Sequence, residues 1–310
     1  MMIAAGIVTF DPDLARLHDN VAAIVPQVDR VLVFDNSSEN QDGVRSIVRS
    51  FANVTLICGT ENFGIGYALN RLAEAAQREG AEWFVTLDQD SVCPPGMVDT
   101  LRATASDATV AMVTPYICDR NKSTPSAEEL ALLPETEIFT QPARRGAITS
   151  GALVRLSAWA NVHGCDEIFF IDYVDYDLNQ RLMDKGYVLI RNNRTQLLHE
   201  VGAARPTWLR VPRKDMSGTW QIERFYAFGH SPFRCYYKAR NRVLFTRKHW
   251  RKLGISHEGI YQLPQQIALT ILFEPDKLAK LKAFARGVRD GILLDLQPDA
   301  SSAPERNNHT

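Results

Sequence analysis

The sequence predicts an α/β fold in which a mostly parallel sheet is covered by helices on both faces. Short apolar segments alternate with amphipathic segments through the first 116 residues, which is the pattern of strand–helix–strand units. Polar residues follow the successive strands, among them Thr9, Asp35, Asn62 and Asp88. Ligands of such sheets bind beyond the carboxyl ends of the strands, so these polar side chains are expected to meet at one site.

Five apolar segments of this first part have the β-branched content of strands. They lie at residues 3–10, 30–34, 53–59, 82–87 and 109–116. After the first of them, Leu14, Leu17 and Val21 recur at helical spacing, with Asp11 as the expected N-cap and Pro12 as the first helical residue. Helices are also expected at residues 43–51 and 64–80, the latter closed by a glycine.

The second half is less regular. Residues 118–146 are polar and contain prolines, which predicts a mobile loop. A strand is expected to follow, with Ser157 as the N-cap of the next helix, and then an acidic helix over residues 172–186. Two short strands, 187–190 and 195–198, precede helices that dominate from about Trp220 onward.

Composition and charge narrow the class of protein. The chain has 310 residues, 45% of them hydrophobic and 23% charged, which is ordinary for globular proteins and excludes disordered and fibrous classes. It has no apolar run of membrane-spanning length, and its five scattered cysteines form no CxxC pair, so a reducing cytoplasm fits best. Residues 191–252 hold fifteen basic and three acidic residues. They form either solvated helix faces or a surface that meets a diphosphate, a lipid phosphate or a membrane; no nucleic-acid motif accompanies them.

The stretch "FVTLDQDSVCPP" places Asp88 and Asp90 one residue apart at the end of a strand. On an extended segment, side chains two apart point to the same side, so both carboxylates can address one divalent cation and a diphosphate. "DQDSV" also fits the signature of haloacid-dehalogenase-like phosphatases, although there the signature follows the first strand. The third interpretation is a polar turn before Pro94 and Pro95.

The order of several short motifs distinguishes these interpretations. The chain resembles the GT-A glycosyltransferases of family 2, and among them the bacterial rhamnosyltransferases, in the stretches "GIVTF", "VFDNSS", "ENFGIGYALN", "TLDQDS", "TSGALVR", "FFIDYVDYDLNQRL", "LLHEVG" and "YYKARN". The resemblance implies a GT-A (Rossmann-like) domain over residues 1–220, with a nucleotide-binding half, 1–115, and an acceptor half, 145–220. A C-terminal helical region, 221–292, and a disordered tail, 293–310, are expected to follow.

The resemblance also implies donor-binding residues. Asp35 matches an acid that accepts a hydrogen bond from the pyrimidine ring of the donor, although a helix N-cap or Asx-turn would also suit "DNSS". Thr9 matches a position beside the base, and Asn62 and Gly64 match a loop against the nucleotide. Arg240 matches a basic position that contacts the diphosphate.

The metal ligands are likewise assigned by resemblance. Asp90 coordinates Mg²⁺ or Mn²⁺, and Asp88 holds the ribose or the metal. His199 matches a histidine that completes the metal shell, with a packed or capping histidine as the alternative.

The general base is expected in "FFIDYVDYDLNQRL". Anchoring the family motif on Arg181 gives Asp175 as the base and Asp177 as a second acid. Val174 replaces the first acid of the family's usual pair, which leaves Asp172 as an alternative base. Acids that stabilise a helix N-terminus are the structural alternative.

The resemblance as a whole implies an inverting transferase that moves L-rhamnose from dTDP-L-rhamnose to a cell-surface polysaccharide precursor. The acceptor is expected to be a glycan, lipid-linked or not, at the inner face of the membrane, with peripheral contact through the basic C-terminal region. A UDP-sugar donor, a non-catalytic nucleotide-sugar binding protein and a phosphatase are the alternatives.

Overall fold

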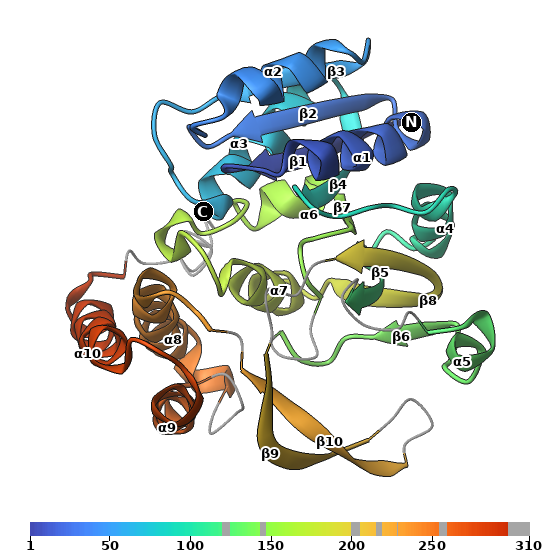
Figure 1. Cartoon of the computed structure of the whole chain (residues 1–310). Helices are drawn as coiled ribbons and strands as arrows, with labels where there is room; N and C mark the ends of the chain where they lie inside the picture. Colours follow the sequence, from blue (N-terminus) through green and yellow to red (C-terminus); the bar gives the residue numbers. More distant parts are fainter. Residues whose placement is uncertain are drawn as a thin grey trace, which may run out of the picture.

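The computed structural model describes residues 1–119, 125–142, 147–199, 205–214, 219–227, 229–253 and 259–296. Its centre is an eight-stranded sheet in the order β3-β2-β1-β4-β7-β5-β8-β6 (Figure 1). β1 to β4 pair in parallel, β7 runs antiparallel to both β4 and β5, β5 and β8 are parallel, and β6 is antiparallel to β8. The strands are β1 Met2–Thr9, β2 Arg30–Asp35, β3 Val54–Cys58, β4 Ala81–Asp88, β5 Val110–Asp119, β6 Thr136–Ile138, β7 Ala152–Arg155 and β8 Val188–His199.

Helices cover both faces of this sheet, as predicted. Two adjacent residues of β4 point to opposite faces of the sheet. Phe84 packs into a core cluster with α3, α6 and α7, and Trp83 packs into a second cluster with α1, α2 and α4. Each cluster is built from fully buried aliphatic side chains, such as Leu72 on the first side and Leu17 on the second. The helices are α1 Leu14–Ile24, α2 Gln41–Arg49, α3 Ile65–Arg78, α4 Met97–Thr104, α5 Ala127–Ala131, α6 Leu156–Asn161, α7 Val174–Asp184, α8 Pro232–Leu253, α9 Leu263–Phe273 and α10 Lys277–Leu293.

Two predicted helix starts were wrong. α1 is capped by Asp13, whose Oδ1 accepts the backbone N–H groups of the next turn, whereas Asp11 lies outside the helix with φ +43°. The Asp11 carboxylate instead accepts the N–H of Glu39 at 2.7 Å. α6 follows β7 without a break and has Arg155, not Ser157, at its N-cap.

The predicted loop 118–146 contains regular structure in its described part. Ser126 and Glu129 form a capping box that begins the short helix α5, and β6 follows it at the edge of the sheet. The two short strands expected around residues 187–198 are one continuous strand, β8, whose register against β5 shifts between Pro115 and Tyr116.

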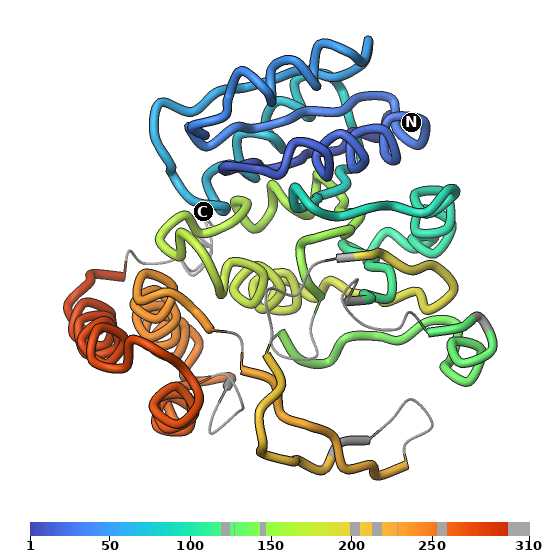
Figure 2. Tube along the Cα trace, in the orientation of Figure 1, coloured from blue at the N-terminus to red at the C-terminus, as the bar shows by residue number. Residues whose placement is uncertain are grey.

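The C-terminal part begins with an antiparallel hairpin that was not predicted. Its strands are β9 Arg205–Lys214 and β10 Trp220–Ala227, and it extends from the body at the lower edge of Figure 2. The helices expected from Trp220 begin only at Pro232, where α8 packs against α10. Their backbones approach closely, since a Cβ on Gly291 would lie 2.7 Å from the carbonyl oxygen of Arg240.

No helix within the described ranges has the length and apolarity needed to cross a bilayer. The tail expected to be disordered lies, from residue 297 on, outside the described residues.

Candidate active site

A cavity of about 1210 Å³ opens beyond the carboxyl ends of β1, β2 and β4. Segment 170–176 and one face of α8 form its opposite wall. The predicted site residues that line it are Asn62, Gly64, Asp88, Asp90, Asp172 and Asp175. Thr9, Asp35 and Arg240 are buried outside this lining.

The loop that carries the paired acids is fixed by its neighbours. The side-chain oxygen of Gln89, between the two acids, accepts the N–H of Phe10 at 2.8 Å, which ties the ends of β4 and β1 together. The hydroxyl of Ser150 accepts the N–H of Asp88 at 3.2 Å and shares a 2.7 Å hydrogen bond with the hydroxyl of Ser91. Asp88 and Asp90 are thereby held at the cavity from two sides.

The donor set suits a hard divalent cation that also binds a phosphate. Within the described ranges, no group of three or more His, Cys, Asp or Glu side chains forms a protein-only metal cage. Mg²⁺ commonly binds through one or two carboxylates and takes its remaining ligands from substrate phosphates and water, so Asp88 and Asp90 fit this role.

The backbone at His199 passes beside this loop. Val92 and Leu198 form an isolated bridge in which the Val92 N–H donates to the Leu198 carbonyl at 3.1 Å. His199 is the last residue of β8 and directly follows Leu198. Its side chain lies outside what the structure describes, so its predicted role as a metal ligand stays a prediction.

Asp35 is satisfied by protein groups alone. Oδ1 accepts the hydroxyls of Thr9 at 2.9 Å and Ser38 at 2.5 Å, and Oδ2 accepts the N–H of Ser38 at 3.1 Å and the amide of Gln41 at 2.8 Å. Burial acts to raise the pKa of Asp35, but these four hydrogen bonds outweigh it and lower the pKa. Local hydrogen bonds of this kind are what the turn alternative predicts, and Thr9 belongs to the same cluster. The predicted contacts of Asp35 and Thr9 with a nucleotide base stay predictions.

The loop before α3 is shaped around a glycine. Gly64 has φ +86°, and a Cβ at this position would lie 2.5 Å from the carbonyl oxygen of Phe170. The side chain of Asn36 holds this loop, accepting the N–H of Phe63 at 3.2 Å and donating to the carbonyl of Gly64 at 3.4 Å. The Asn62 side chain accepts the Gly64 N–H at 3.0 Å, so the backbone here can approach a ligand closely.

The opposite wall is a strained segment held by α8. Phe170, Asp172 and Tyr173 all have positive φ, a conformation that costs side-chain-bearing residues free energy. The buried amide of Asn241 supports the segment by donating to the carbonyls of Phe169 at 2.6 Å and Ile171 at 2.7 Å, and it also reaches that of Asp172.

Asp172 and Asp175 both line the cavity but have different partners. Asp172 forms a two-point ion pair with Arg234, at 3.2 and 3.3 Å. Asp175 accepts the N–H of Tyr176 at 2.9 Å. Burial raises the pKa of Asp175 to about 7, and the negative charges of Asp172 and Asp88 add to this effect. Asp175 therefore has the proton affinity of a general base at neutral pH, whereas Asp172 is engaged by a cation.

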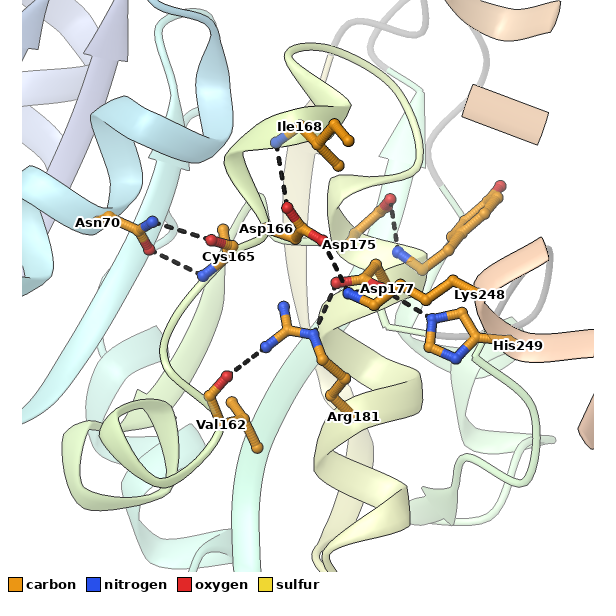
Figure 3. Close-up of polar contacts among 11 residues, drawn as sticks. Asn70, Val162, Cys165, Asp166, Ile168, Asp175, Asp177, Arg181, Lys248 and His249 are labelled. Atoms are coloured by element: carbon orange, nitrogen blue, oxygen red, sulfur yellow. Dashed lines mark hydrogen bonds and ion pairs between the residues drawn. The ribbon is translucent and has the colours of Figure 1, made fainter. Parts of the chain in front are cut away.

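Asp177, the third acid of the segment, is buried in a charged network between α7 and α8 (Figure 3). Its carboxylate contacts Arg181 at 2.7 Å, Lys248 at 2.9 Å and Nε2 of His249 at 2.8 Å. Burial acts to raise the pKa of Asp177, but the hydrogen bond from His249 and the charges of Arg181 and Lys248 outweigh it and lower the pKa. Asp177 therefore joins two helices, and it does not line the cavity.

Arg240, the residue of α8 predicted to contact the diphosphate, does not line the cavity. Arg240 donates from Nε to the Asn241 side chain at 2.9 Å and from its guanidinium to the carbonyl of Ile168, so it supports the wall from behind. Arg234, Lys238 and Arg242 line the cavity instead. Their spacing of four residues places them on one helix face, which is the signal that could have found them.

These three cations share the cavity with four acids, one of which, Asp172, pairs with Arg234. Burial lowers the pKa of Lys238; the charge of Asp172 acts to raise it, and the charges of Arg234 and Arg242 act to lower it, so that the pKa is lowered overall. Lys238 contacts Nε2 of His230 at 2.7 Å. Burial and the positive charges of Lys238 and Arg234 lower the pKa of His230 to about 3, so this histidine is neutral. An anionic group in the cavity would be stabilised by this face.

An aromatic cluster completes this wall. The ring of Phe170 stacks on Tyr237 with centroids 4.8 Å apart, and Phe233 packs edge-on against Tyr237 at the same distance. All three side chains line the cavity. This wall thus combines a flat apolar surface with positive charge.

The chain was compared with known proteins. The sequence profile of the family described as "Glycosyl transferase family 2" matches residues 7–158. The dTDP-rhamnosyl transferase RfbF of Shigella flexneri is 26% identical over 302 residues, covering 94% of this chain and 95% of that protein. The N-acetylglucosaminyl-diphospho-decaprenol L-rhamnosyltransferase of Mycobacterium tuberculosis is 29% identical over 222 residues, or 61% of this chain and 72% of that protein.

Among solved structures, GalNAc-T7 with UDP, GalNAc and Mn²⁺ superposes with a TM-score of 0.56 at 14% identity. The match covers 94% of this chain and 56% of that chain. At this identity the likeness concerns the fold, and it confirms the predicted GT-A class of mixed, mostly parallel sheet followed by C-terminal helices.

Proposed function

The chain belongs to glycosyl transferase family 2, and we propose that it is an inverting transferase that moves L-rhamnose from dTDP-L-rhamnose to a cell-surface polysaccharide precursor. The donor and the acceptor class rest on the relatives, one of which is described as a dTDP-rhamnosyl transferase and the other as an L-rhamnosyltransferase acting on a diphospholipid-linked sugar. Both relatives are below 30% identity, so donor identity is the first thing to test.

The proposal depends on one observation: Asp172, Asp175 and Asp177 have different partners, which leave only one of them suited to act as the base. Arg234 engages Asp172, and the α7–α8 network engages Asp177. Asp175 remains at the cavity with a pKa of about 7, across from Asp88 and Asp90. A base of this proton affinity, facing two acids that suit a cation bound to a diphosphate, is the arrangement that a single-displacement sugar transfer requires.

In the proposed reaction, Asp175 accepts the proton of an acceptor hydroxyl as its oxygen bonds to the anomeric carbon of the donor. The bond from that carbon to the diphosphate oxygen breaks, and the nucleotide diphosphate leaves with the electron pair. Asp88 and Asp90 would hold Mg²⁺ or Mn²⁺, which when bound neutralises negative charge on the diphosphate.

Two sets of residues would position the substrates. Asn62 and Gly64 offer a backbone surface to the nucleotide. Arg234, Lys238 and Arg242 replace Arg240 as the candidates for contact with substrate phosphates, since they line the cavity. The ring stack of Phe170 and Tyr237 offers a flat face to an acceptor sugar.

The test is a panel of nucleotide sugars with Mn²⁺ or Mg²⁺, in which nucleotide diphosphate release is measured with and without a lipid-linked acceptor fraction. We expect release from dTDP-L-rhamnose that depends on acceptor and on metal. A preference for a UDP-sugar would overturn the rhamnose assignment, and release from no donor would overturn the catalytic proposal and favour a binding protein. Hydrolysis of a simple phosphate ester that is lost in Asp88→Asn would favour the phosphatase alternative.

One variant tests the role of Asp90 as a metal ligand. Asp90→Asn should raise the Mn²⁺ concentration needed for half-maximal activity at least tenfold, because it removes one of two protein carboxylates. Isothermal titration of Mn²⁺ in the presence of the nucleotide diphosphate measures the same loss without turnover. An unchanged metal requirement would exclude Asp90 as a ligand.

A further inference from the structure

One face of the β9–β10 hairpin exposes large apolar side chains to solvent. Trp208 is 74% exposed, Trp220 66% and Ile222 71%. Side chains two residues apart in a strand share a face, and the register places Trp220 opposite Lys214 and Ile222 opposite Pro212, so Trp220 and Ile222 lie on one side of the ribbon. Trp208 lies beyond a shift of this register and packs, together with Phe225, against Phe273 of α9. A two-stranded ribbon is marginally stable in water, and this one exposes Trp220 and Ile222 on one face.

The same face carries concentrated positive charge. Arg210 and Arg224 are direct partners in the register and lie between the apolar residues. Like charges opposite one another destabilise a strand pair unless an anion compensates them. Among the described residues of the hairpin, the acidic one is Glu223. The register places it opposite Val211, so it lies on the face of the ribbon opposite to Arg210 and Arg224. The charge arrangement thus calls for a negatively charged partner.

The surface continues onto α9 and reaches the candidate active site. The ring of Trp208 lies 5.4 Å from that of Phe273, at the end of α9, where Ile271 and Leu272 are also exposed. Gln266 lines the cavity seven residues earlier on the same helix, which is about 10 Å along the helix axis. A partner bound to this face would lie close to the cavity.

We propose that this face of β9–β10, together with the end of α9, docks on an anionic lipid surface. Tryptophan and arginine are the side chains that occupy the headgroup region of a bilayer, with apolar rings inserted and guanidinium groups on lipid phosphates. A second copy of the chain fits less well, because a twofold pairing of this face would bring four arginines together. Docking would hold the cavity at the bilayer surface.

The test uses the full chain and vesicles of defined composition. We expect it to sediment with vesicles containing about 30% phosphatidylglycerol in phosphatidylcholine, and at least tenfold more weakly with phosphatidylcholine alone. Arg210→Gln combined with Arg224→Gln should lower the partition coefficient roughly thirtyfold at low salt. Arg205→Gln removes a charge from the opposite face of β9 and should change it less than about fivefold.

The apolar contribution is tested separately. Trp220→Ser combined with Ile222→Ser should abolish sedimentation, while Gln221→Ser, on the opposite face of β10, should retain it. Circular dichroism should be unchanged and the melting temperature should not fall in any variant, since these side chains are exposed.

Three results would overturn the proposal. The first is that the chain binds neutral and anionic vesicles equally well. The second is that the opposite-face control variants lose as much binding as the test variants. The third is that the chain binds no vesicles but forms a dimer, which the combined substitutions Trp220→Ser and Ile222→Ser dissociate. None of these measurements uses a nucleotide sugar, so a failure here is distinct from a failure of the proposed transfer reaction.

Discussion

The raised pKa of Asp175 makes its carboxyl a useful base in catalysis, and we predict that the same carboxyl lowers the stability of the folded chain. Burial and the charges of Asp172 and Asp88 raise its pKa from 3.8 to about 7. In the interval between these values the folded chain retains a proton that the unfolded chain has released. Stability therefore falls as the pH rises from about 4 to about 7, because the folded state binds more protons than the unfolded state.

The size of the effect follows from the shift. A difference of about three pH units at about 1.4 kcal/mol each gives an upper bound of about 4 kcal/mol. Asp175 is partly exposed at the cavity, so solvent screening reduces this, and we expect about 1–3 kcal/mol. Asparagine has nearly the same shape and no charge. Asp175→Asn should therefore unfold with a free energy about 1–3 kcal/mol higher than the wild type at pH 8, and about equal at pH 4.

Urea denaturation across this pH range, with EDTA present, measures the effect without bound metal. Asp172→Asn is the matched control: it removes the same charge from the same wall, but it also removes the ion pair with Arg234, so it should bring no gain at pH 8. In transfer assays, kcat/KM of the wild type should rise through about pH 7. Asp175→Asn should lower kcat by about 10²–10⁴-fold.

The reasoning fails on either of two results. The first is an Asp175→Asn variant that is no more stable than the wild type at pH 8. The second is near-normal turnover in that variant combined with loss in Asp172→Asn, which would make Asp172 the base.

Two further predictions concern the framework of the site. Asp177→Asn leaves buried cations uncompensated and should lower the free energy of unfolding, measured by urea titration, by about 3–5 kcal/mol. Asp184→Asn breaks an ion pair at the surface and should lower it by less than about 1 kcal/mol. Equal losses in the two variants would contradict a buried network. Gly64→Ala should lower stability by at least about 2 kcal/mol and raise KM for the donor, because its Cβ would lie 2.5 Å from a carbonyl oxygen. Gly80→Ala, with φ +87° and no atom within 4 Å of its Cβ, should cost about 1 kcal/mol and leave KM unchanged.

The first half of the fold could be predicted because each element buries one regular face. The strands before residue 90 are short apolar runs, and α3 shows Leu69, Leu72 and Ala76 at helical spacing, all buried. Helix starts were harder, because both Asp11 and Asp13 precede α1 and only the tertiary position of Asp11, bonded to Glu39, decides between them.

The hairpin was missed for a physical reason. β10 has exposed residues on both faces at its start, so the apolar–polar alternation that marks a half-buried strand is absent there. α5 was missed because five residues are too few to show a helical period, although the capping pair Ser126 and Glu129 was a usable signal.

The candidate site was also predicted in part. The resemblance assigned Asp88, Asp90 and Asp175 to one site, and all three line the cavity, because parallel strands end at the same edge of the sheet. It did not anticipate that Asp35 has four protein hydrogen-bond donors, since three of them belong to local turns of residues 38 and 41. It also selected Arg240, because a motif match does not show which face of a helix meets the cavity.

The assignment of roles among the acids of residues 172–177 depends on α8. These acids lie within six residues and have the same chemistry, and the local residue that distinguishes one of them is Arg181, which pairs with Asp177 four residues earlier. α8 supplies Arg234 to Asp172, and Lys248 and His249 to Asp177, and leaves Asp175 facing the cavity. Asn241 of the same helix holds the strained backbone between them. This helix lies beyond residues 7–158, the range matched by the family profile, so the choice of the general base rests on a part of the chain that the profile does not cover.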